Sequence, residues 1–524
     1  MPSFSKSLRW IAPVSLVLSL LAVYLFSMAP DFTWAHDGAD GGDLITAVAS
    51  GGVPHPSGYP TFILLARLFQ LLPVGSIAYR TNMMSALFTA LTALLVYDIV
   101  TGSPGSPAKG NTLAGVIAGV AYGLSPLAWS QAVITEVYGL HIFFVALLLW
   151  LLLGRYAGSP NKLSLDVAVG LSLGLAMGNH LTSVFLLPAV LLVDVVDPLV
   201  WRSRRKHGVL ASLDWAALGR RLGGLFAGLL VYVVIPWRAA SGAPVNWGDA
   251  TNLGKLWWLV SGDFYHHYAF SLPLEYLPLR ILSVASLLLT QFGLLGLLAG
   301  LFHLVRSSFF SRLSLVGVWV ALANVIFSLG YSTSDSYIYL LPFFLVFALW
   351  IGLGVGEIDS LLARQGSWAS LIVSAILLAV SVGMALLNYP KLDLSADHHA
   401  QKFEQAVFAA LPPQAIVVAK GDQALFSLWY YHFILKERPD VAILADGLLS
   451  FPWYIDVLHA TYPTLNISPD APSPEAVARA NPTRPTCEVL VTNEQIEQLS
   501  LLCYPPGSYS PDAPSVSILQ PIGQ

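Results

Sequence analysis

Long apolar runs separated by short polar segments cover most of the chain up to residue 388. The first run spans residues 11–29, and about ten more runs are each long enough for a membrane-spanning helix of about 20 residues. The centres of these later runs lie near Ala90, Gly119, Val145, Leu173, Leu187, Leu229, Leu289, Val320, Phe344 and Leu377. The pattern predicts an α-helical polytopic membrane protein with about eleven transmembrane helices.

Two apolar segments near the N-terminus need separate interpretations. The run over residues 11–29 could be a signal peptide, but no small-x-small cleavage motif follows it, so we expect a retained first helix. The stretch over residues 61–72 is apolar but short and contains Arg67. These features favour an interfacial or re-entrant helix over a membrane span.

The composition agrees with a membrane protein and excludes one class of partner. Of the 524 residues, 56% are hydrophobic and 11% are charged, whereas soluble domains carry about 25% charged residues. The formal net charge is −4, and Lys and Arg form no large basic cluster apart from one short loop. Nucleic acid is therefore not an expected partner.

The pattern of residues changes after residue 389. Residues 415–419 and 441–445 have the pattern of strands on either side of a helix over 423–436, and residues 488–492 have the pattern of a further strand. We therefore expect a transmembrane domain over residues 1–389 and an α/β domain over residues 390–524. Cys487 and Cys503 could form a disulfide if this end of the chain faces an oxidising compartment.

The positive charges are distributed unevenly among the predicted loops. The loops on one side hold Lys6, Arg9, Lys109, Arg155, Lys162, Arg202, Arg204, Arg205, Lys206, Arg220, Arg221, Arg306, Arg312 and Arg364. The short polar segments around Asp40, Glu136, His180 and Asp335 hold none. The positive-inside rule therefore predicts a cytoplasmic N-terminus, with the first loop and the C-terminal domain extracytoplasmic. The expected membrane is the bacterial plasma membrane or that of the endoplasmic reticulum.

The first outer loop, residues 33–82, contains most of the candidate chemistry. Asp37, Asp40 and Asp43 recur at every third residue, and a helix over residues 40–50 would place Asp40 and Asp43 on one face. Either Asp40 or Asp43 could act as a general base. Alternatively, these carboxylates only cap the helix. Their spacing is a poor metal-ligand signature, so no metal is expected.

A segment rich in proline follows the acidic residues. The sequence from His55 to Pro60 reads His-Pro-Ser-Gly-Tyr-Pro, and its two prolines and glycine predict a stiff corner. His55 and Tyr59 are candidate substrate-binding residues in this corner. Arg80 follows at the outer end of the second long apolar run. Its guanidinium could bind a lipid phosphate, or it could simply reach the headgroup region.

Further polar residues recur at the other predicted outer turns. Glu136, His180 and Asp335 each lie at such a turn, and their convergence on one membrane face suggests a single site. His180 alone would more often be a structural histidine. The outer loop over residues 236–278 adds Asp249 and His266 among several Trp and Tyr residues. These aromatic residues could form an interfacial belt or a sugar site, and both interpretations stay open.

Several of these motifs resemble the polytopic GT-C glycosyltransferases. The shared pattern is an acidic pair after the first helix, then H-P-x-G-Y-P, then A-x-R-x-N-x-x-S-A-L. The matching residues are Asp40, Asp43, His55, Pro56, Gly58, Tyr59, Pro60, Ala78, Arg80, Asn82, Ser85, Ala86 and Leu87. The resemblance continues at residues 136–138, 178–180, 421–422 and 438–440. Within that superfamily the chain resembles the protein O-mannosyltransferase-like branch long labelled as a domain of unknown function, whose animal member acts on plexin-type IPT domains.

The resemblance implies a GT-C-like fold and a glycosyltransferase activity. A sugar, expected to be mannose, would move with inversion from a polyprenyl- or dolichyl-phosphate carrier to an extracytoplasmic acceptor. That acceptor is expected to be a protein Ser or Thr, or else a glycan or a lipid. The resemblance also implies that a first-loop carboxylate is the base, without deciding between Asp40 and Asp43. Apart from this lipid-linked donor and membrane lipid, no cofactor is expected.

A membrane transporter or flippase of lipid-linked or polar substrates is the alternative function. Such proteins bind their substrates near the bilayer midplane, between helices broken at matching positions. The polar residues of this chain gather instead at one membrane face. A single pocket at the outer face would favour the transferase, and a midplane cavity open to both sides would favour the transporter. A third possible function is that of a binding or scaffold protein whose outer domain carries the function. The acidic first loop argues against it, because that loop would then have no role.

The predicted topology can be tested with reporter fusions. A reporter fused after Gln524 should report the extracytoplasmic side, and one inserted near Ser203 should report the cytoplasm, because the positive residues flank the latter position. Compartment-specific reporter activity measures both. Activity on the same side for the two fusions would contradict the eleven-helix topology.

Overall fold

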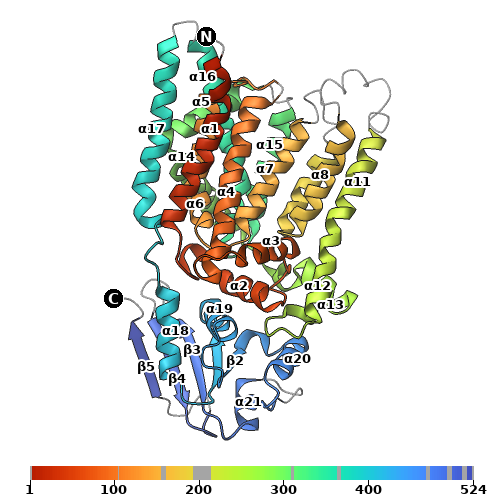
Figure 1. Cartoon of the computed structure of the whole chain (residues 1–524), viewed down its shortest axis with the longest axis vertical. Helices are drawn as coiled ribbons and strands as arrows, with labels where there is room; N and C mark the ends of the chain where they lie inside the picture. Colours follow the sequence, from red (N-terminus) through yellow and green to blue (C-terminus); the bar gives the residue numbers. More distant parts are fainter. Residues whose placement is uncertain are drawn as a thin grey trace.

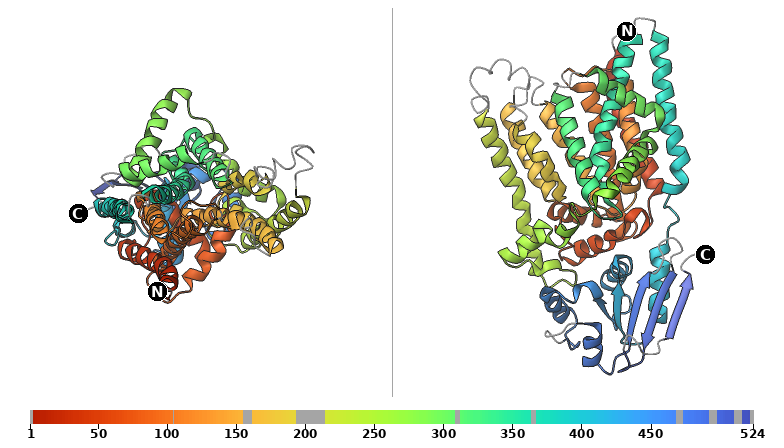
Figure 2. Two further views of the ribbon diagram at one scale, coloured as in Figure 1. Left: turned by 90° about the horizontal axis from the view of Figure 1, so that it is seen from above. Right: turned by 180° about the vertical axis from the view of Figure 1, so that it is seen from behind.

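The computed structural model describes residues 3–521, except residue 104 and residues 155–160, 193–213, 308–311, 363–366, 468–472, 492–497 and 510–515. The chain forms a long helical bundle that carries a smaller domain with a five-stranded sheet at one end (Figure 1). The view from behind shows the same two-part arrangement (Figure 2).

The helices of the bundle run mostly along its long axis (Figure 1). They are α1 (Ser3–Ser27), α4 (Ile77–Gly102), α5 (Thr112–Gly123), α6 (Pro126–Ala132), α7 (Tyr138–Gly154), α8 (Lys162–Met177), α9 (Leu187–Leu192), α11 (Trp215–Leu229), α14 (Leu277–Arg306), α15 (Arg312–Gly330), α16 (Leu341–Leu362) and α17 (Ser367–Leu392). The short helices α12 (Val234–Ala239) and α13 (Leu253–Ser261) lie near the end that carries the smaller domain.

The described helices support an integral membrane protein. Among the residues that the structure describes, six helices are long and apolar enough to cross a membrane, or up to seven if the bent pair α5 and α6 is one span. Three further apolar helices, Tyr138–Leu153, Leu181–Leu191 and Ser314–Gly330, are shorter. The larger number of about eleven transmembrane helices therefore stays a prediction.

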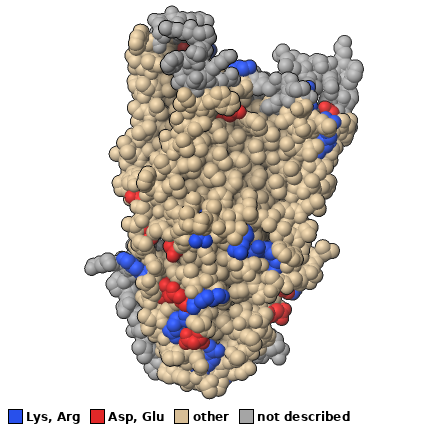
Figure 3. Space-filling model, in the orientation of Figure 1, with Lys and Arg blue, Asp and Glu red and all other residues tan. Residues whose placement is uncertain are grey.

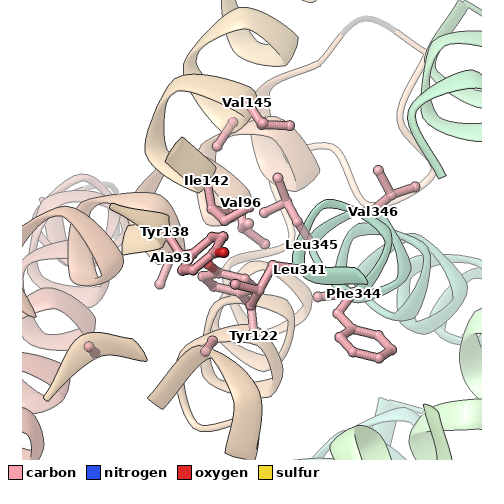
Figure 4. Close-up of a cluster of buried hydrophobic side chains, with 14 of the residues drawn as sticks. Ala93, Val96, Tyr122, Tyr138, Ile142, Val145, Leu341, Phe344, Leu345 and Val346 are labelled. Carbon is pink, nitrogen blue, oxygen red and sulfur yellow. The ribbon is translucent and has the colours of Figure 1, made fainter. Parts of the chain in front are cut away.

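Tertiary packing gives equally apolar helices different surroundings. The apolar windows of α16 and α17 have mean hydropathies of 2.3 and 2.5, yet 89% of the first window is buried and only 17% of the second. Helix α16 is the centre of the bundle, where Phe344 and Leu345 pack among residues of α4, α5 and α7 such as Val96 and Ile142 (Figure 4). The outer helices instead present apolar side chains to the surroundings, as lipid contact requires.

The surface shows the same division. On the face shown in Figure 3, Lys, Arg, Asp and Glu are sparse over the middle of the bundle and gather toward its ends and over the smaller domain. The wide band of uncharged surface on this face of the bundle matches the hydrocarbon layer of a membrane, because burying a charge there is costly.

Two short helices lie across the end of the bundle, between it and the smaller domain (Figure 1). Helix α2 (Asp40–Ser50) has the limits that the spacing of its aspartates suggested. Helix α3 (Pro60–Gln70) has 11 residues, too few to span a membrane, and exposes Leu64 and Leu68 on its outer side. Its position and exposed leucines agree with the interfacial or re-entrant helix predicted for this stretch.

The smaller domain is built around a mixed sheet with strand order β2-β1-β3-β4-β5. The strands are β1 (Ile416–Lys420), β2 (Ala442–Ala445), β3 (Thr486–Val491), β4 (Gln498–Tyr504) and β5 (Val516–Pro521). Strand β1 is parallel to β2 and β3, and β4 is antiparallel to β3 and β5. The predicted strands and helix at residues 415–445 lie where β1, α19 (Asp422–Trp429) and β2 form. Helices α18 (His399–Ala410), α20 (Pro452–Thr461) and α21 (Pro474–Ala480) complete the domain.

A disulfide joins two neighbouring strands of this sheet. Cys487 on β3 lies directly opposite Cys503 on β4, and their Sγ atoms are bonded. The structure thus forms the pairing that the sequence left open. Because disulfides persist mainly outside reducing compartments, this bond is compatible with an extracytoplasmic location of the domain.

Two neighbouring glycines of α2 allow close packing, Gly42 against the smaller domain and Gly41 against the bundle. An added Cβ at Gly42 would lie 2.6 Å from the carbonyl oxygen of Phe426 on α19, and one at Gly41 would lie 2.9 Å from the carbonyl oxygen of Thr135. Trp34 strengthens this junction by donating its indole N–H to Ser427 Oγ at 2.8 Å. The glycines between Asp40 and Asp43 therefore let backbone approach α2 on two sides.

The close approach at Gly42 predicts that even alanine is too large there. Gly42→Ala should destabilise the folded chain by about 1–3 kcal/mol, since backbone rather than a flexible side chain occupies the space. Gly383→Ala on α17 is the matched control, because nothing lies within 4 Å of its added Cβ. Thermal unfolding of the purified full-length chain in detergent compares the two. Equal melting temperatures for both variants would contradict the proposed packing.

Candidate active site

A cavity of about 960 Å³ lies at the junction between the bundle and the smaller domain. The first loop supplies one wall, between Trp34 and Tyr59. The loops at the end of the bundle supply a second wall, within residues 180–185, 261–269 and 327–339. The smaller domain closes the third wall with residues 420–423 at the end of β1 and residues 490–491 at the end of β3.

Most of the residues predicted to form the site meet in this cavity. Its lining includes Asp40, His55, Tyr59, His180, His266 and Asp335. These side chains come from the first loop, from the turn after α8, from the loop between α13 and α14 and from the turn after α15. The cavity thus contains the convergence of polar residues on one end of the bundle that the sequence suggested.

Asp40 and Asp43 begin α2 one turn apart but have opposite surroundings. The Asp40 side chain is 45% exposed and faces the cavity, whereas the Asp43 side chain is fully buried. Asp43 Oδ2 accepts hydrogen bonds from the backbone N–H of His55 at 2.9 Å and from His55 Nδ1 at 2.7 Å. Asp43 Oδ1 accepts a third from Trp247 Nε1 at 3.0 Å. Asp43 therefore holds the rigid corner and the 236–278 loop against α2.

The hydrogen bonds around His55 indicate a protonated imidazole. Tyr59 donates its hydroxyl proton to the carbonyl of Pro56 at 3.0 Å, so it can only accept from His55 Nε2, which lies 2.9 Å away. His55 Nδ1 donates to Asp43, so both ring nitrogens carry a proton. Burial by itself lowers the pKa of His55, but the carboxylates of Asp40 and Asp43 outweigh it and raise the pKa to about 9.

Asp40 is the carboxylate that titrates near neutral pH. Burial within the walls of the cavity raises the pKa of Asp40 to about 7, although part of its side chain faces the cavity space. The charge of His55, whose Nε2 lies 3.5 Å from Asp40 Oδ2, opposes this shift. The charges of Asp422, Asp43 and Asp335 add to it. A carboxylate with a pKa near the working pH suits a general base.

Two other predicted residues take supporting positions. Glu136 is buried beside the cavity and is not part of its lining, and burial raises its pKa, so that the neutral carboxyl is favoured. His180 lines the cavity, and burial lowers its pKa to about 4. Its Nδ1 lies 2.7 Å from Thr182 Oγ1, so this neutral ring can offer a hydrogen bond but no positive charge at neutral pH.

Arg80 and Asp249 lie outside the cavity lining, in contrast to their predicted substrate-binding roles. The guanidinium of Arg80 donates from Nε to the carbonyl of Val74 at 2.6 Å, from Nη1 to that of Gln70 at 2.9 Å, and from Nη2 to that of Gly75 at 3.0 Å. It therefore satisfies the carbonyl of the last residue of α3, which lacks a helical partner, and two carbonyls of the loop that follows. Asp249 instead pairs with Lys255 Nζ at 2.5 Å.

Some aromatic residues of the 236–278 loop have the exposure of an interfacial belt, and others lie at the candidate site. Trp257 is 72% exposed on the surface, as expected of an interfacial belt. Trp247 is buried and binds Asp43, and Tyr265 lines the cavity. The same loop therefore contributes both to the outer surface and to the site.

Sequence reasoning missed the contribution of the smaller domain to the cavity. Lys420 and Asp422 line it from the end of β1 and the start of α19. The signal that could have found them is the strand–Gly–Asp–helix order, because ligands of α/β sheets bind at the carboxyl ends of parallel strands. Within the described residues, no group of three or more His, Cys, Asp or Glu side chains is placed to hold a metal ion. Independence from metal stays a prediction.

Comparison with known proteins supports the predicted resemblance. The family model described as the protein O-mannosyl-transferase TMEM260 N-terminal domain matches residues 40–200, and the model of TMEM260-associated domain 2 matches residues 400–472. The chain is 28% identical to the Mus musculus protein O-mannosyl-transferase TMEM260 over 88% of its own length and 66% of that protein. It is 23% identical to the Dictyostelium discoideum protein of the same name over 84% of its own length and 58% of that protein.

A solved structure shows the same fold. ArnT from Cupriavidus metallidurans, crystallised with undecaprenyl phosphate, aligns with a TM-score of 0.53 and 14% identity over 92% of this chain and 93% of that one. The chain has a GT-C-like fold. The predicted resemblance to GT-C, O-mannosyltransferase-like membrane proteins is confirmed. The chain spans about two thirds or less of the length of these curated relatives, at 66% and 58%.

The buried hydrogen bonds of Asp43 predict that its replacement by Asn strongly lowers the stability of the fold, by an amount that depends on pH. Asp43→Asn should destabilise the fold by about 3–5 kcal/mol, because His55 and Trp247 lose a buried charged acceptor. Since the pKa of His55 is raised from 6.5 to about 9, the stabilisation from its charge is fully present below pH 6.5 and is lost as pH rises to about 9. The difference in unfolding free energy between the parent and Asp43→Asn should therefore become smaller as the pH rises from 6.5 to about 9.

Thermal unfolding of the full-length chain in detergent at several pH values measures this effect. Asp249→Asn is the control, because its partly exposed pair with Lys255 should contribute only about 0–1 kcal/mol. A parent-to-Asp43→Asn difference that is as small as the control, or that does not change with pH, would contradict the buried ion pair.

Proposed function

We propose that this chain is a membrane glycosyltransferase that moves mannose from a polyprenyl- or dolichyl-phosphate carrier to a hydroxyl group of an extracytoplasmic acceptor, with inversion. The observation that supports this most directly is the Asp40 carboxylate, which faces a cavity of about 960 Å³ at the end of the helical bundle. The named relatives are protein O-mannosyl-transferases, and the fold neighbour ArnT was crystallised with a polyprenyl phosphate. We extend both properties to this chain.

Asp40, rather than Asp43, is the proposed general base. A base must contact the acceptor hydroxyl, and Asp40 reaches the cavity. Asp43 is fully buried, and both of its oxygens already accept hydrogen bonds from His55 and Trp247. We therefore assign Asp43 a positioning role, in which it fixes the ring of His55 beside Asp40.

The proposed reaction is a single displacement at the anomeric carbon of the donor. Asp40 accepts the proton of the acceptor hydroxyl, and that oxygen forms a bond to the anomeric carbon as the bond from this carbon to the phosphate oxygen breaks. The electron pair leaves with the carrier phosphate, which is already charged and needs no proton. The charge of the protonated His55 lowers the pKa of Asp40 and so favours its ionised form before the reaction.

The departing phosphate requires positive charge nearby. The cavity offers the positively charged ring of His55 for this purpose. Arg80 is unsuitable because backbone carbonyls occupy its guanidinium. Aromatic rings on the bundle side of the cavity, such as Tyr138, Tyr265 and Tyr339, offer flat faces for the sugar.

The position of the cavity favours a transferase over a transporter or flippase. The lining described here lies at the end of the bundle, where α2 and α3 cross it and the smaller domain covers it (Figure 1). Transporters hold their substrates near the bilayer midplane instead. We place this end outside the cytoplasm because of the positive-inside pattern and the Cys487–Cys503 disulfide.

The assignment of the base predicts a kinetic effect of one amide substitution. Asp40→Asn should lower the rate of sugar transfer by about 10²- to 10⁴-fold, because the amide retains the shape but cannot accept a proton. The parent rate should rise with pH around pH 7, as the Asp40 carboxyl ionises with its pKa of about 7. Turnover of labelled polyprenyl-phosphate mannose by the purified full-length chain measures both.

The donor should still bind to this variant. Undecaprenyl phosphate should raise the melting temperature of Asp40→Asn as much as that of the parent, since Asp40 interacts with the acceptor rather than with the carrier. Donor turnover by Asp40→Asn at the parent rate would show that the base lies elsewhere.

A further inference from the structure

The cavity contains a second exposed carboxylate that the proposed reaction does not use. Asp422 is exposed in the lining, at the first position of α19. Within the described part of the chain, its side chain has no hydrogen bond or ion pair. The nearby Lys420 is paired with Glu488 instead. Asp422 therefore retains its capacity to accept hydrogen bonds from a bound molecule.

This carboxylate does not assist the proposed base. The charge of Asp422 raises the pKa of Asp40 and so opposes the ionisation that a base requires. Alternatively, the sole role of Asp422 is to place a negative charge at the N-terminus of α19. That role does not require its side chain to face the cavity. Placing Asp422 near Asp40 is costly, because each carboxylate disfavours ionisation of the other. A contact between Asp422 and a substrate explains why the site contains both.

The direction from which each substrate enters separates the two walls of the cavity. The carrier lipid must come from the bilayer around the bundle, whose middle shows few charges in Figure 3. The smaller domain projects away from that band, and the walls it contributes therefore face the water-soluble substrate (Figures 1 and 2). Asp422 lies on this side, at the start of α19.

The wall on the side of the smaller domain has the chemistry of a polypeptide site rather than a glycan site. Its residues from β1, α19 and β3 are Lys420, Gly421, Asp422, Gln423, Leu490 and Val491, and none of these is aromatic. The space over Gly421 is open, because an added Cβ would meet nothing within 4 Å. Leu490 is 38% exposed, which offers an apolar contact for a side chain. Sugars instead favour the flat aromatic faces of the bundle side.

From this placement we infer that Asp422 is an acceptor-binding residue, which accepts hydrogen bonds from an acceptor polypeptide passing over Gly421 between the ends of β1 and β3. This inference rests on the proposed function and adds a residue that binds the acceptor. The acceptor hydroxyl then lies between Asp422 on the smaller domain and Asp40 on α2.

Asp422→Asn tests the inference because it removes the charge and keeps the shape of the side chain. Gly421 is the N-cap of α19 and no side chain caps the helix there, so the substitution removes only the favourable effect of a negative charge at the helix N-terminus. Membranes containing the full-length variant are incubated with labelled polyprenyl-phosphate mannose, and label is counted in acid-precipitated protein. The initial rate into protein should fall about 10- to 100-fold at limiting acceptor, which is the usual effect of losing one hydrogen bond to a charged group.

Asp446→Asn is the matched control. Asp446 follows β2 at the same edge of the sheet as Asp422 follows β1, but it is not part of the cavity lining. Its replacement should leave the rate into protein at the parent level. Undecaprenyl phosphate should stabilise the purified parent, Asp422→Asn and Asp446→Asn against thermal unfolding to the same extent, because carrier binding does not involve Asp422.

The outcomes separate this inference from the proposed function. An unchanged rate into protein for Asp422→Asn would overturn the inference, as would loss of stabilisation by undecaprenyl phosphate, which would place Asp422 in the donor site. Label that the parent transfers to glycan or lipid rather than protein would also overturn it. A parent that does not consume the labelled donor at all would overturn the proposed function itself.

Discussion

The buried carboxylate of Asp43 is the contact on which the geometry of the site depends. It joins α2 to the rigid corner through His55 and to a distant loop through Trp247, 204 residues away. A buried carboxylate is costly unless donors satisfy both of its oxygens, so these three segments have one favourable arrangement. That arrangement directs the second ring nitrogen of His55 toward Asp40 and Tyr59. The protonated ring of His55 thus places a positive charge beside Asp40 in the cavity.

Close backbone packing allows this arrangement to form next to a second domain. Gly41 and Gly42 let the backbone near Thr135 and near Phe426 approach α2 from two sides. Larger residues would separate α19 from α2 and open the cavity between them. The smaller domain thus determines part of the shape of the site and also contributes Asp422 to it. Both domains line the same cavity.

Much of the local structure follows from short-range patterns in the sequence. The helix at residues 40–50, the short apolar helix that follows the His55–Pro60 corner, and the strands near residues 416–420 and 442–445 all lie where residue spacing predicted them. The convergence of Asp40, His55, Tyr59, His180 and Asp335 could also be predicted, because apolar runs of membrane length place alternate turns at the same face. Asp422 could not be weighted from spacing alone, because its importance depends on which sheet edge faces the bundle.

The sequence by itself determined that the chain has an apolar helical bundle, an acidic and proline-locked first loop, and a terminal strand–helix–strand unit, because these are properties of neighbouring residues. Only the tertiary structure decided the role that each polar side chain can have. Asp40 and Asp43 are equivalent in spacing, yet one faces a cavity and the other is fully buried. From its sequence position Arg80 could bind a lipid phosphate or reach the headgroup region, yet its guanidinium binds backbone carbonyls. Exposure and partners are set by segments far apart in the chain, and residue spacing contains no information about their approach.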